Sequence, residues 1–274
     1  MAENQRPQLP PEVLARIKAE TEAREALLPY FQACETTHEG YTMPYRLYVP
    51  AGLEEGKKYP IVLFLHGLGE SGTDNVGHIV NNEGAAIWVN DHLNGGEPRF
   101  VLAPQLPDPK DPDAAEGEPG VRWTLKAQKA ILALLDELLV QYPIDENRQY
   151  ITGLSLGGYG SWMLQTLSVG RFACVVSCCP ACLAEGGIYH KGIADCATTL
   201  DNTALWMFHA EDDGMVPVAI SRLMKEQLEL NTRVCGRDFF YTEYPAEHHY
   251  NHFCWGAAYA NEEMRAWMFQ QRKA

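Results

Sequence analysis

Short apolar runs recur along this chain and are separated by longer amphipathic segments. Most of the runs show no alternation of apolar and polar residues, a pattern typical of strands that are buried on both faces of a parallel sheet. The runs are residues 59–67, 100–105, 148–155, 172–177, 204–210 and 237–245. Two further short strands are expected within residues 35–50, which end in the sequence YRLYVP.

Helical patterns lie between these strands. Apolar residues recur at helical spacing in residues 124–142, 218–230 and 261–273. Strands that alternate with helices indicate an α/β fold, with a mostly parallel central sheet and helices on both faces. Two irregular stretches, residues 105–123 and 180–202, follow strands. Such loops form the ligand site in open α/β sheets.

The N-terminal part of the chain has a helical pattern of its own. It covers residues 11–33, and its prolines are suited to the first turn of a helix. The apolar residues Val13, Ile17 and Leu27 must rest on another surface. We therefore expect residues 1–34 to be a helical extension, either packed on the main domain or forming a homo-oligomer contact, and residues 35–274 to be one α/β domain.

The charge and composition of the chain limit the classes of partner that we expect it to bind. The formal charge of −14 disfavours binding to nucleic acid or to anionic membranes. No apolar stretch is long enough to span a bilayer, and the polar N-terminus has no apolar core of a signal peptide. We expect a cytoplasmic protein, secreted only if a signal peptide has been removed, whose cysteines are mostly buried, reduced thiols.

A candidate nucleophile lies between an apolar run and a helical segment. The sequence Gly-Leu-Ser-Leu-Gly at residues 153–157 places Ser155 on a sharp strand-to-helix turn, where flanking glycines let the backbone pass closely. This turn, the nucleophile elbow, is typical of α/β hydrolases. The backbone N–H of Leu156 would begin the following helix and point at an oxyanion formed on the substrate.

A second oxyanion donor is expected after the first buried strand. In α/β hydrolases it is a backbone N–H from this loop, which here reads His66-Gly67-Leu68-Gly69-Glu70. The residue after His-Gly, Leu68, is the natural candidate. The His66 side chain is expected to hydrogen-bond to the loop backbone rather than to take part in the chemistry.

The acid and the base follow in the chain order Ser, acid, His. Asp212 and Asp213 both lie in the turn after residues 204–210, and one of them is expected to be only a turn residue. The base is His248, His249 or His252, after the last strand. A zinc site at these histidines is the alternative, but no carboxylate or cysteine partner stands at a firm spacing.

The chain resembles the α/β-hydrolase branch that includes polyhydroxybutyrate-depolymerase-like and feruloyl-esterase-like proteins, with many sequences labelled predicted peptidases. The resemblance covers about residues 40–270 and is carried by YRLYVPAGLEEGKKYPIVLFLHGLGESGTDN, FVLAPQLP, YPIDENRQYITGLSLGGYGSWML and FHAEDDGMVPV. The family motif His-Gly-x-x-Asp-x-x-Val-Pro implies Asp213 as the acid, with Ala210 in place of the glycine. In the family, a Trp follows the catalytic histidine by three residues. Trp255 therefore implies His252 as the base, and His249 remains the alternative.

These features predict a serine hydrolase of the carboxylesterase type, with residues 35–274 as the catalytic domain. It would cleave esters of small, medium or hydroxycinnamoyl-type acyl groups through an acyl-enzyme, without metal or cofactor. Trp123 and His249 are expected to line the substrate pocket. The alternatives are a serine peptidase of the oligopeptidase type and a non-catalytic binding protein on the same fold.

Overall fold

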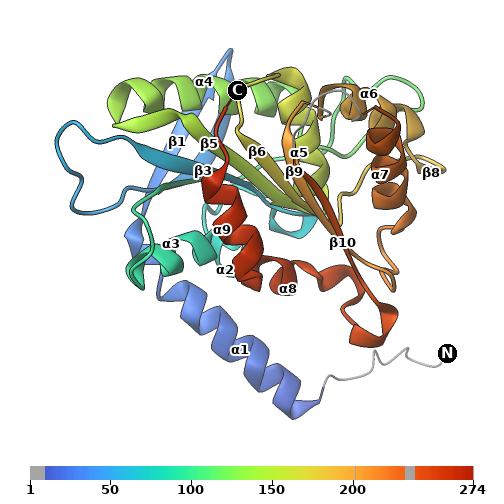
Figure 1. The fold of residues 1–274 in the computed structure, drawn as a ribbon, viewed down its shortest axis with the longest axis horizontal. Helices are drawn as coiled ribbons and strands as arrows, with labels where there is room; N and C mark the ends of the chain where they lie inside the picture. Colours follow the sequence, from blue (N-terminus) through green and yellow to red (C-terminus); the bar gives the residue numbers. More distant parts are fainter. Residues whose placement is uncertain (1–9, 201, 232–237, 274) are drawn as a thin grey trace.

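An eight-stranded, mostly parallel sheet forms the centre of the protein in a computed structural model, which describes residues 10–200, 202–231 and 238–273 (Figure 1). The strand order is β1-β2-β4-β3-β5-β6-β9-β10. The pairs β1/β2 and β2/β4 are antiparallel, and the remaining neighbours are parallel. The strands are β1 (Phe31–His38), β2 (Tyr41–Tyr48), β3 (Tyr59–Leu65), β4 (Phe100–Pro104), β5 (Ile144–Leu154), β6 (Cys174–Cys178), β9 (Ala204–Ala210) and β10 (Phe239–Tyr244).

Helices cover both faces of the sheet, as the alternation of strands and helices predicts. One face carries α4 (Leu125–Gln141), α5 (Leu156–Leu167), α6 (His190–Leu200) and α7 (Ala219–Asn231). The other carries α2 (Gly77–Val80), α3 (Ala86–Leu93), α8 (Trp255–Ala260) and α9 (Glu262–Gln270). The fold is that of the α/β hydrolases.

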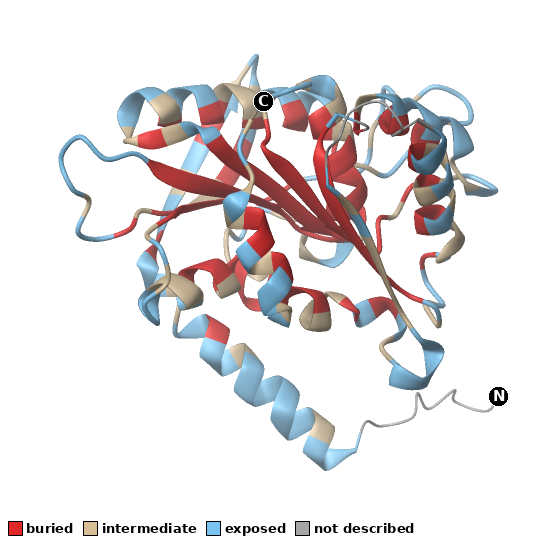
Figure 2. Ribbon diagram, viewed as in Figure 1, coloured by how far each residue is buried: buried red, intermediate tan, exposed pale blue. Residues whose placement is uncertain are grey.

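The buried strands explain why their sequences show no alternation. Every residue of β3 is buried, as the red central strands of Figure 2 illustrate. Leu63 and Leu65 pack into the apolar layer under α4 and α5, whereas Phe64 packs into the layer under α3 and α8. Because both faces of such a strand need apolar side chains, the run is continuously apolar.

The N-terminal helix is shorter than the sequence pattern predicts. Helix α1 (Pro11–Glu25) ends four residues before Pro29, which has no N–H to donate to the Glu25 carbonyl oxygen, and a 3-10 turn at Leu28–Tyr30 follows. Strand β1 then begins at Phe31, which is buried and pairs with Tyr48. Residues 31–34, which we assigned to the extension, therefore belong to the sheet.

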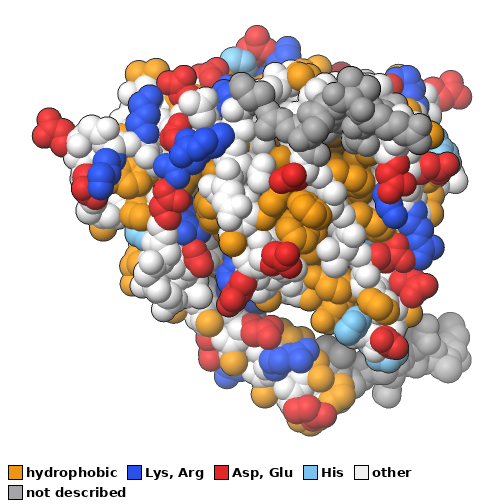
Figure 3. All heavy atoms as spheres, in the orientation of Figure 1, with side chains coloured by type: hydrophobic (Ala, Val, Ile, Leu, Met, Phe, Trp, Pro, Cys, Tyr) orange, Lys and Arg blue, Asp and Glu red, His pale blue; other side chains and the backbone are white. Residues whose placement is uncertain are grey.

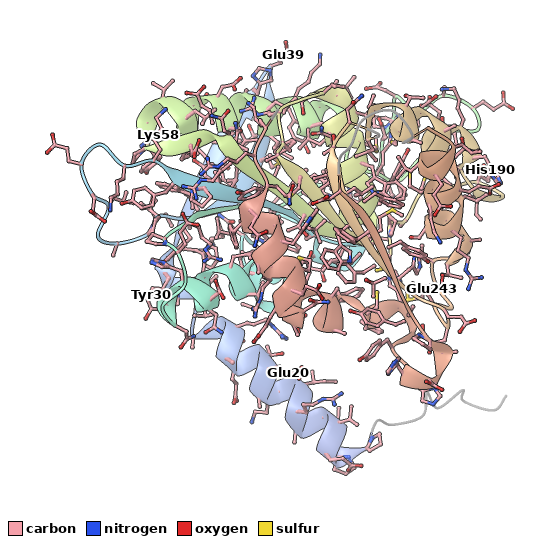
Figure 4. The ribbon with its side chains drawn as sticks, viewed as in Figure 1. Glu20, Tyr30, Glu39, Lys58, His190 and Glu243 are labelled. Atoms are coloured by element: carbon pink, nitrogen blue, oxygen red, sulfur yellow. The ribbon has the colours of Figure 1, made fainter. Side chains whose placement is uncertain are left out.

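Helix α1 projects from the body and is attached at its C-terminal end (Figure 1). There the buried Arg24 guanidinium donates to the Val80 carbonyl oxygen at 2.7 Å and pairs with the Glu83 carboxylate at 2.8 Å. Glu20, labelled on this helix in Figure 4, lies 3.8 Å from Arg16, and both side chains are exposed. Leu14 and Ile17 are 51% and 43% exposed, so a homo-oligomer contact through this helix stays a prediction.

The sequence pattern missed several short elements. Residues 180–202, expected to be irregular, contain α6 and a small hairpin of β7 (Leu183–Ala184) and β8 (Gly187–Ile188). The mixed sequence HKGIADCATTL carries glycine and threonines, which are poor helix formers, and α6 is stabilised by packing of Ile193 and Leu200 on the core. Helices α2, α3 and α8 were not predicted either.

Helix length and surface charge are the two features that relate to possible membrane or nucleic-acid partners. No helix in the described ranges is long and apolar enough to cross a membrane. On the face drawn in Figure 3, Lys and Arg side chains are interspersed with Asp and Glu and form no continuous basic patch.

Candidate active site

Ser155 stands at a strained turn between β5 and α5. Its backbone has φ 53° and ψ −118°, a left-handed conformation that is costly for a residue with a side chain. A Cβ added to Gly153 would lie 2.2 Å from the Gly157 carbonyl oxygen, and one added to Gly157 would lie 1.9 Å from the Leu65 carbonyl oxygen. Only glycine fits at either position, as the motif predicts.

The structure brings Ser155, His252 and Asp213 together. His252 Nε2 lies 2.9 Å from Ser155 Oγ, and His252 Nδ1 lies 2.8 Å from Asp213 Oδ2. A carboxylate can only accept, so Nδ1 carries the proton and the lone pair of Nε2 faces the serine hydroxyl. Ser155 is partly buried and His252 is 5% exposed.

The Asp213 carboxylate is fully surrounded by donors. Its Oδ1 accepts the backbone N–H groups of Met215 at 2.9 Å and Val216 at 2.8 Å. Burial would raise the pKa of Asp213, but hydrogen bonds from His209, His252 and the Val216 N–H outweigh it and hold the pKa well below its usual range. Asp213 therefore stays ionised and can stabilise a positive charge on His252.

Asp212 has a different role, which separates the two candidate acids. Its carboxylate accepts the backbone N–H of Asn251 at 3.0 Å, and the Asn251 side chain accepts the N–H of His252 at 2.8 Å. Asp212 thus secures the turn that carries His252, Asn251–Phe253, to the loop after β9.

The other two histidines after β10 lie outside this constellation. His248 and His249 are exposed, and His249 has a left-handed backbone with φ 53°. Neither makes a hydrogen bond to Ser155 or Asp213 within the described part of the chain. Whether His249 lines a substrate pocket stays a prediction.

The predicted oxyanion donors flank the nucleophile. Leu68 begins a short 3-10 turn and Leu156 begins α5, so neither N–H has a partner inside its own helix. Neither N–H donates to a turn or loop acceptor among residues 10–200, 202–231 and 238–273. The loop touches the elbow, because a Cβ on Gly67 would lie 3.5 Å from the Ser155 Cβ. The role of both N–H groups as oxyanion donors stays a prediction.

His66 holds this loop in place, as expected. Its Nδ1 lies 2.6 Å from the Gly67 carbonyl oxygen, and its Nε2 lies 2.9 Å from the Leu106 nitrogen. The carbonyl must accept and the amide must donate, so His66 is neutral with its proton on Nδ1. Burial lowers the pKa of His66 to about 4, in keeping with a neutral ring.

The predicted place of Trp123 in the substrate pocket is wrong for this structure. Trp123 is completely buried, so its ring offers no surface to a substrate. The ring centroid lies 5.0 Å from that of His66, and Nε1 donates to the His66 carbonyl oxygen at 3.3 Å. Trp123 supports the oxyanion loop from below.

The three histidines after β10, the ligands of the alternative zinc site, do not form a common group of potential metal ligands in the described ranges. Within the described ranges, one group of three or more potential ligands lies within 4.8 Å, namely Cys179, Asp213 and His252. The last two already bond to each other, and burial raises the pKa of the Cys179 thiol far above the range in which a thiolate would form. The Cys-x-x-Cys pair Cys179 and Cys182 is buried and not disulfide-bonded.

Two side chains beside the site, His209 and Glu70, were not predicted from the sequence. His209, at the end of β9, has its Nε2 3.2 Å from Asp213 Oδ2. The signal was present, because a histidine in a fully apolar strand, directly before the acid loop, needs a polar partner. Glu70, in the oxyanion loop, has its pKa raised by burial, an effect that a hydrogen bond with Asn82 opposes.

Two buried histidines make stability depend on pH. Burial lowers the pKa of His66 to about 4 and that of His78 to about 3, below the value of about 6.5 in an unfolded chain. Acid therefore protonates the unfolded state first, and the free energy of unfolding should fall between about pH 6.5 and about pH 4, by about 3 kcal/mol for each histidine. Urea unfolding at several pH values measures this fall.

The His78→Gln variant provides the comparison. It removes one ionisable group, so its fall over the same pH range should be about 3 kcal/mol smaller than that of the unaltered protein. Parallel curves for the two proteins would show that His78 does not titrate in this way.

Comparison with known proteins agrees with this geometry. The solved structure "Crystal Structure of a Thermostable Esterase" superposes with a TM-score of 0.76 at 34% identity and matches 90% of this chain and 64% of its own. The chain thus spans less than two thirds of that esterase. No curated protein sequence matches the chain.

Two peptidase structures share the fold alone, each at 15% identity. The "putative dipeptidyl aminopeptidase IV from Bacteroides ovatus" has a TM-score of 0.60 and covers 88% of this chain, and 36% of its own length is matched. An acylaminoacyl peptidase in complex with a chloromethyl ketone has a TM-score of 0.53 and covers 78% of this chain and 36% of its own.

The sequence model of the Esterase family, described as "Putative esterase", matches residues 37–265, which include the elbow, the oxyanion loop and both loops that carry Asp213 and His252. The chain therefore belongs to the Esterase family and has the α/β-hydrolase fold.

Proposed function

We propose that this protein hydrolyses carboxylic esters through a Ser155–His252–Asp213 triad and an acyl-enzyme intermediate. The observation that carries the proposal is the bridge made by His252, 2.9 Å from Ser155 Oγ on one side and 2.8 Å from Asp213 Oδ2 on the other. A general base within hydrogen-bond reach of both a hydroxyl and a carboxylate is the arrangement that nucleophilic catalysis by serine needs.

The first half of the reaction forms the acyl-enzyme. Ser155 Oγ attacks the ester carbonyl carbon while His252 Nε2 takes the hydroxyl proton. The carbonyl oxygen becomes an oxyanion that accepts hydrogen bonds from the N–H groups of Leu68 and Leu156. The intermediate then expels the alcohol, which takes the proton from His252, and the acyl group remains on Ser155.

The second half repeats these roles with water. His252 removes a proton from water as the water oxygen attacks the acyl carbon, and the proton then returns to Ser155 Oγ as the acid leaves. Asp213 stabilises the imidazolium in both halves, because its lowered pKa keeps the carboxylate charged.

Apolar side chains beside the triad support an apolar acyl group as the substrate. Each loop that carries catalytic machinery also presents one: Leu68 is 52% exposed, Met215 is 66% exposed and Phe253 is 64% exposed. Exposed apolar residues on the loops that carry the triad favour an apolar ligand. We propose small, medium or hydroxycinnamoyl-type acyl esters as the substrate class.

A substrate panel tests this function against the peptidase alternative. We expect turnover of p-nitrophenyl acetate, p-nitrophenyl butyrate and methyl ferulate, and much slower turnover of an aminoacyl p-nitroanilide. Faster cleavage of the anilide would favour a peptidase. Absence of any turnover, together with no labelling by a fluorophosphonate, would favour a non-catalytic binding protein.

A further inference from the structure

His209 is a second histidine in contact with the Asp213 oxygen that binds His252. It is fully buried at the end of β9, and its Nε2 is 3.2 Å from Asp213 Oδ2 and 3.0 Å from the Val216 carbonyl oxygen. Both neighbours of this nitrogen are acceptors, so Nε2 carries a proton. The N–H of His209 is thus shared between the Val216 carbonyl oxygen and Asp213 Oδ2, which also accepts from His252 Nδ1 at 2.8 Å.

Ser221 fixes His209 in turn. Its Oγ, buried on α7, lies 2.7 Å from His209 Nδ1. With the proton on Nε2, a neutral His209 accepts the Ser221 hydroxyl proton at Nδ1. The acceptors at Nε2 select this tautomer, and the Ser221 hydroxyl, which can donate or accept, fixes the orientation of the ring.

The groups that donate to Asp213 come from two different parts of the fold, its own loop and strand β9. The Met215 and Val216 N–H groups belong to the same loop as Asp213 and move with it. His209 instead belongs to β9, a central strand whose residues are all buried. By contacting both the carboxylate and the Val216 carbonyl oxygen, His209 ties the acid loop to the sheet.

We propose, on the basis of the triad mechanism above, that His209, held by Ser221, is a positioning residue that acts on catalysis through Asp213. It keeps Oδ2 in line with His252 Nδ1, and hence His252 Nε2 in line with Ser155. A displacement of about 1 Å in such a chain can cost about 10²-fold in rate. Loss of the His209 N–H is therefore expected to lower kcat about 10- to 100-fold.

Substitutions that differ in the N–H group test this role. His209→Leu fills the site without a donor and should lower kcat about 10- to 100-fold with little change in KM. His209→Gln can place its amide N–H near the position of Nε2 and should retain kcat within about threefold of the unaltered enzyme. Ser221→Ala removes the hydrogen bond that orients the ring and should fall between the two.

A double-mutant cycle separates positioning from a merely structural role. In an Asp213→Ala background, His209→Leu should change the residual kcat by less than about twofold, because the carboxylate through which it acts is gone. The same loss in both backgrounds, or a loss in His209→Gln as large as in His209→Leu, would overturn the proposal. If His209→Leu does not fold, Ser221→Ala replaces it in the same cycle.

The triad itself is tested separately. Ser155→Ala, assayed alongside with the same activated ester, reports on the proposed function whatever the His209 variants do. High activity in Ser155→Ala would refute the triad mechanism, whereas an inactive Ser155→Ala with a fully active His209→Leu would refute only the positioning role.

Discussion

Changing Ser155 to alanine should lower ester turnover by about 10⁴- to 10⁶-fold, the range found when one member of a triad is removed. The Ser155 hydroxyl supplies the attacking atom, and it is the group that His252 Nε2 faces at 2.9 Å. What remains should come from binding and from the oxyanion donors alone. The measurement is kcat for an activated ester at saturating concentration.

A matched serine provides the control. Ser168, which follows the last residue of α5, donates its hydroxyl to the Leu164 carbonyl oxygen at 2.7 Å. Ser168→Ala should therefore keep nearly full turnover. Thermal unfolding of Ser155→Ala should show an intact fold, and more than a tenth of the original turnover in that variant would rule out Ser155 as the nucleophile.

His252→Ala should fall nearly as far as Ser155→Ala, because members of a triad act as a unit and their losses do not add. His252 is the residue that reaches Ser155 and Asp213 at once, at 2.9 and 2.8 Å. Without it, the serine hydroxyl has no base and the leaving alcohol has no acid. Turnover of the same ester by the purified variant gives the comparison.

His249→Ala is the paired control, since this exposed histidine lies on the same loop. It should retain much of the rate and lose no more than about tenfold if the side chain lines the pocket. A severe loss in His249→Ala with an active His252→Ala would assign the base to His249 and leave the hydrolase activity standing.

The elbow and the sheet could be predicted from sequence because their constraints are local. The Gly153 and Gly157 backbones approach other backbone atoms so closely that only glycine fits, and this requirement is visible in five consecutive letters. A strand buried on both faces, such as β3, likewise shows its environment in its own composition. The oxyanion loop could be located in the sequence because it directly follows β3.

The base and acid were harder to assign because their roles depend on distant contacts. Asp212 and Asp213 are neighbours in sequence, and only the fold shows that the first bonds to the Asn251 N–H and the second to His252. Trp123 was misassigned because a tryptophan in a polar loop can face a pocket or pack inward. Here it packs beneath His66. His209 was missed although its place in an apolar strand signalled a polar partner, because only the fold shows that this partner is the Asp213 carboxylate.

Mapping the covalent adduct of a fluorophosphonate tests the central claim most directly. After inhibition of the purified protein, peptide mass spectrometry should locate one adduct on Ser155. Ser155→Ala should carry none, and labelling of His252→Ala should be far slower because the hydroxyl has lost its base. An adduct on another residue of the inactivated enzyme, or ester hydrolysis that continues undiminished once Ser155 is fully labelled, would contradict the account.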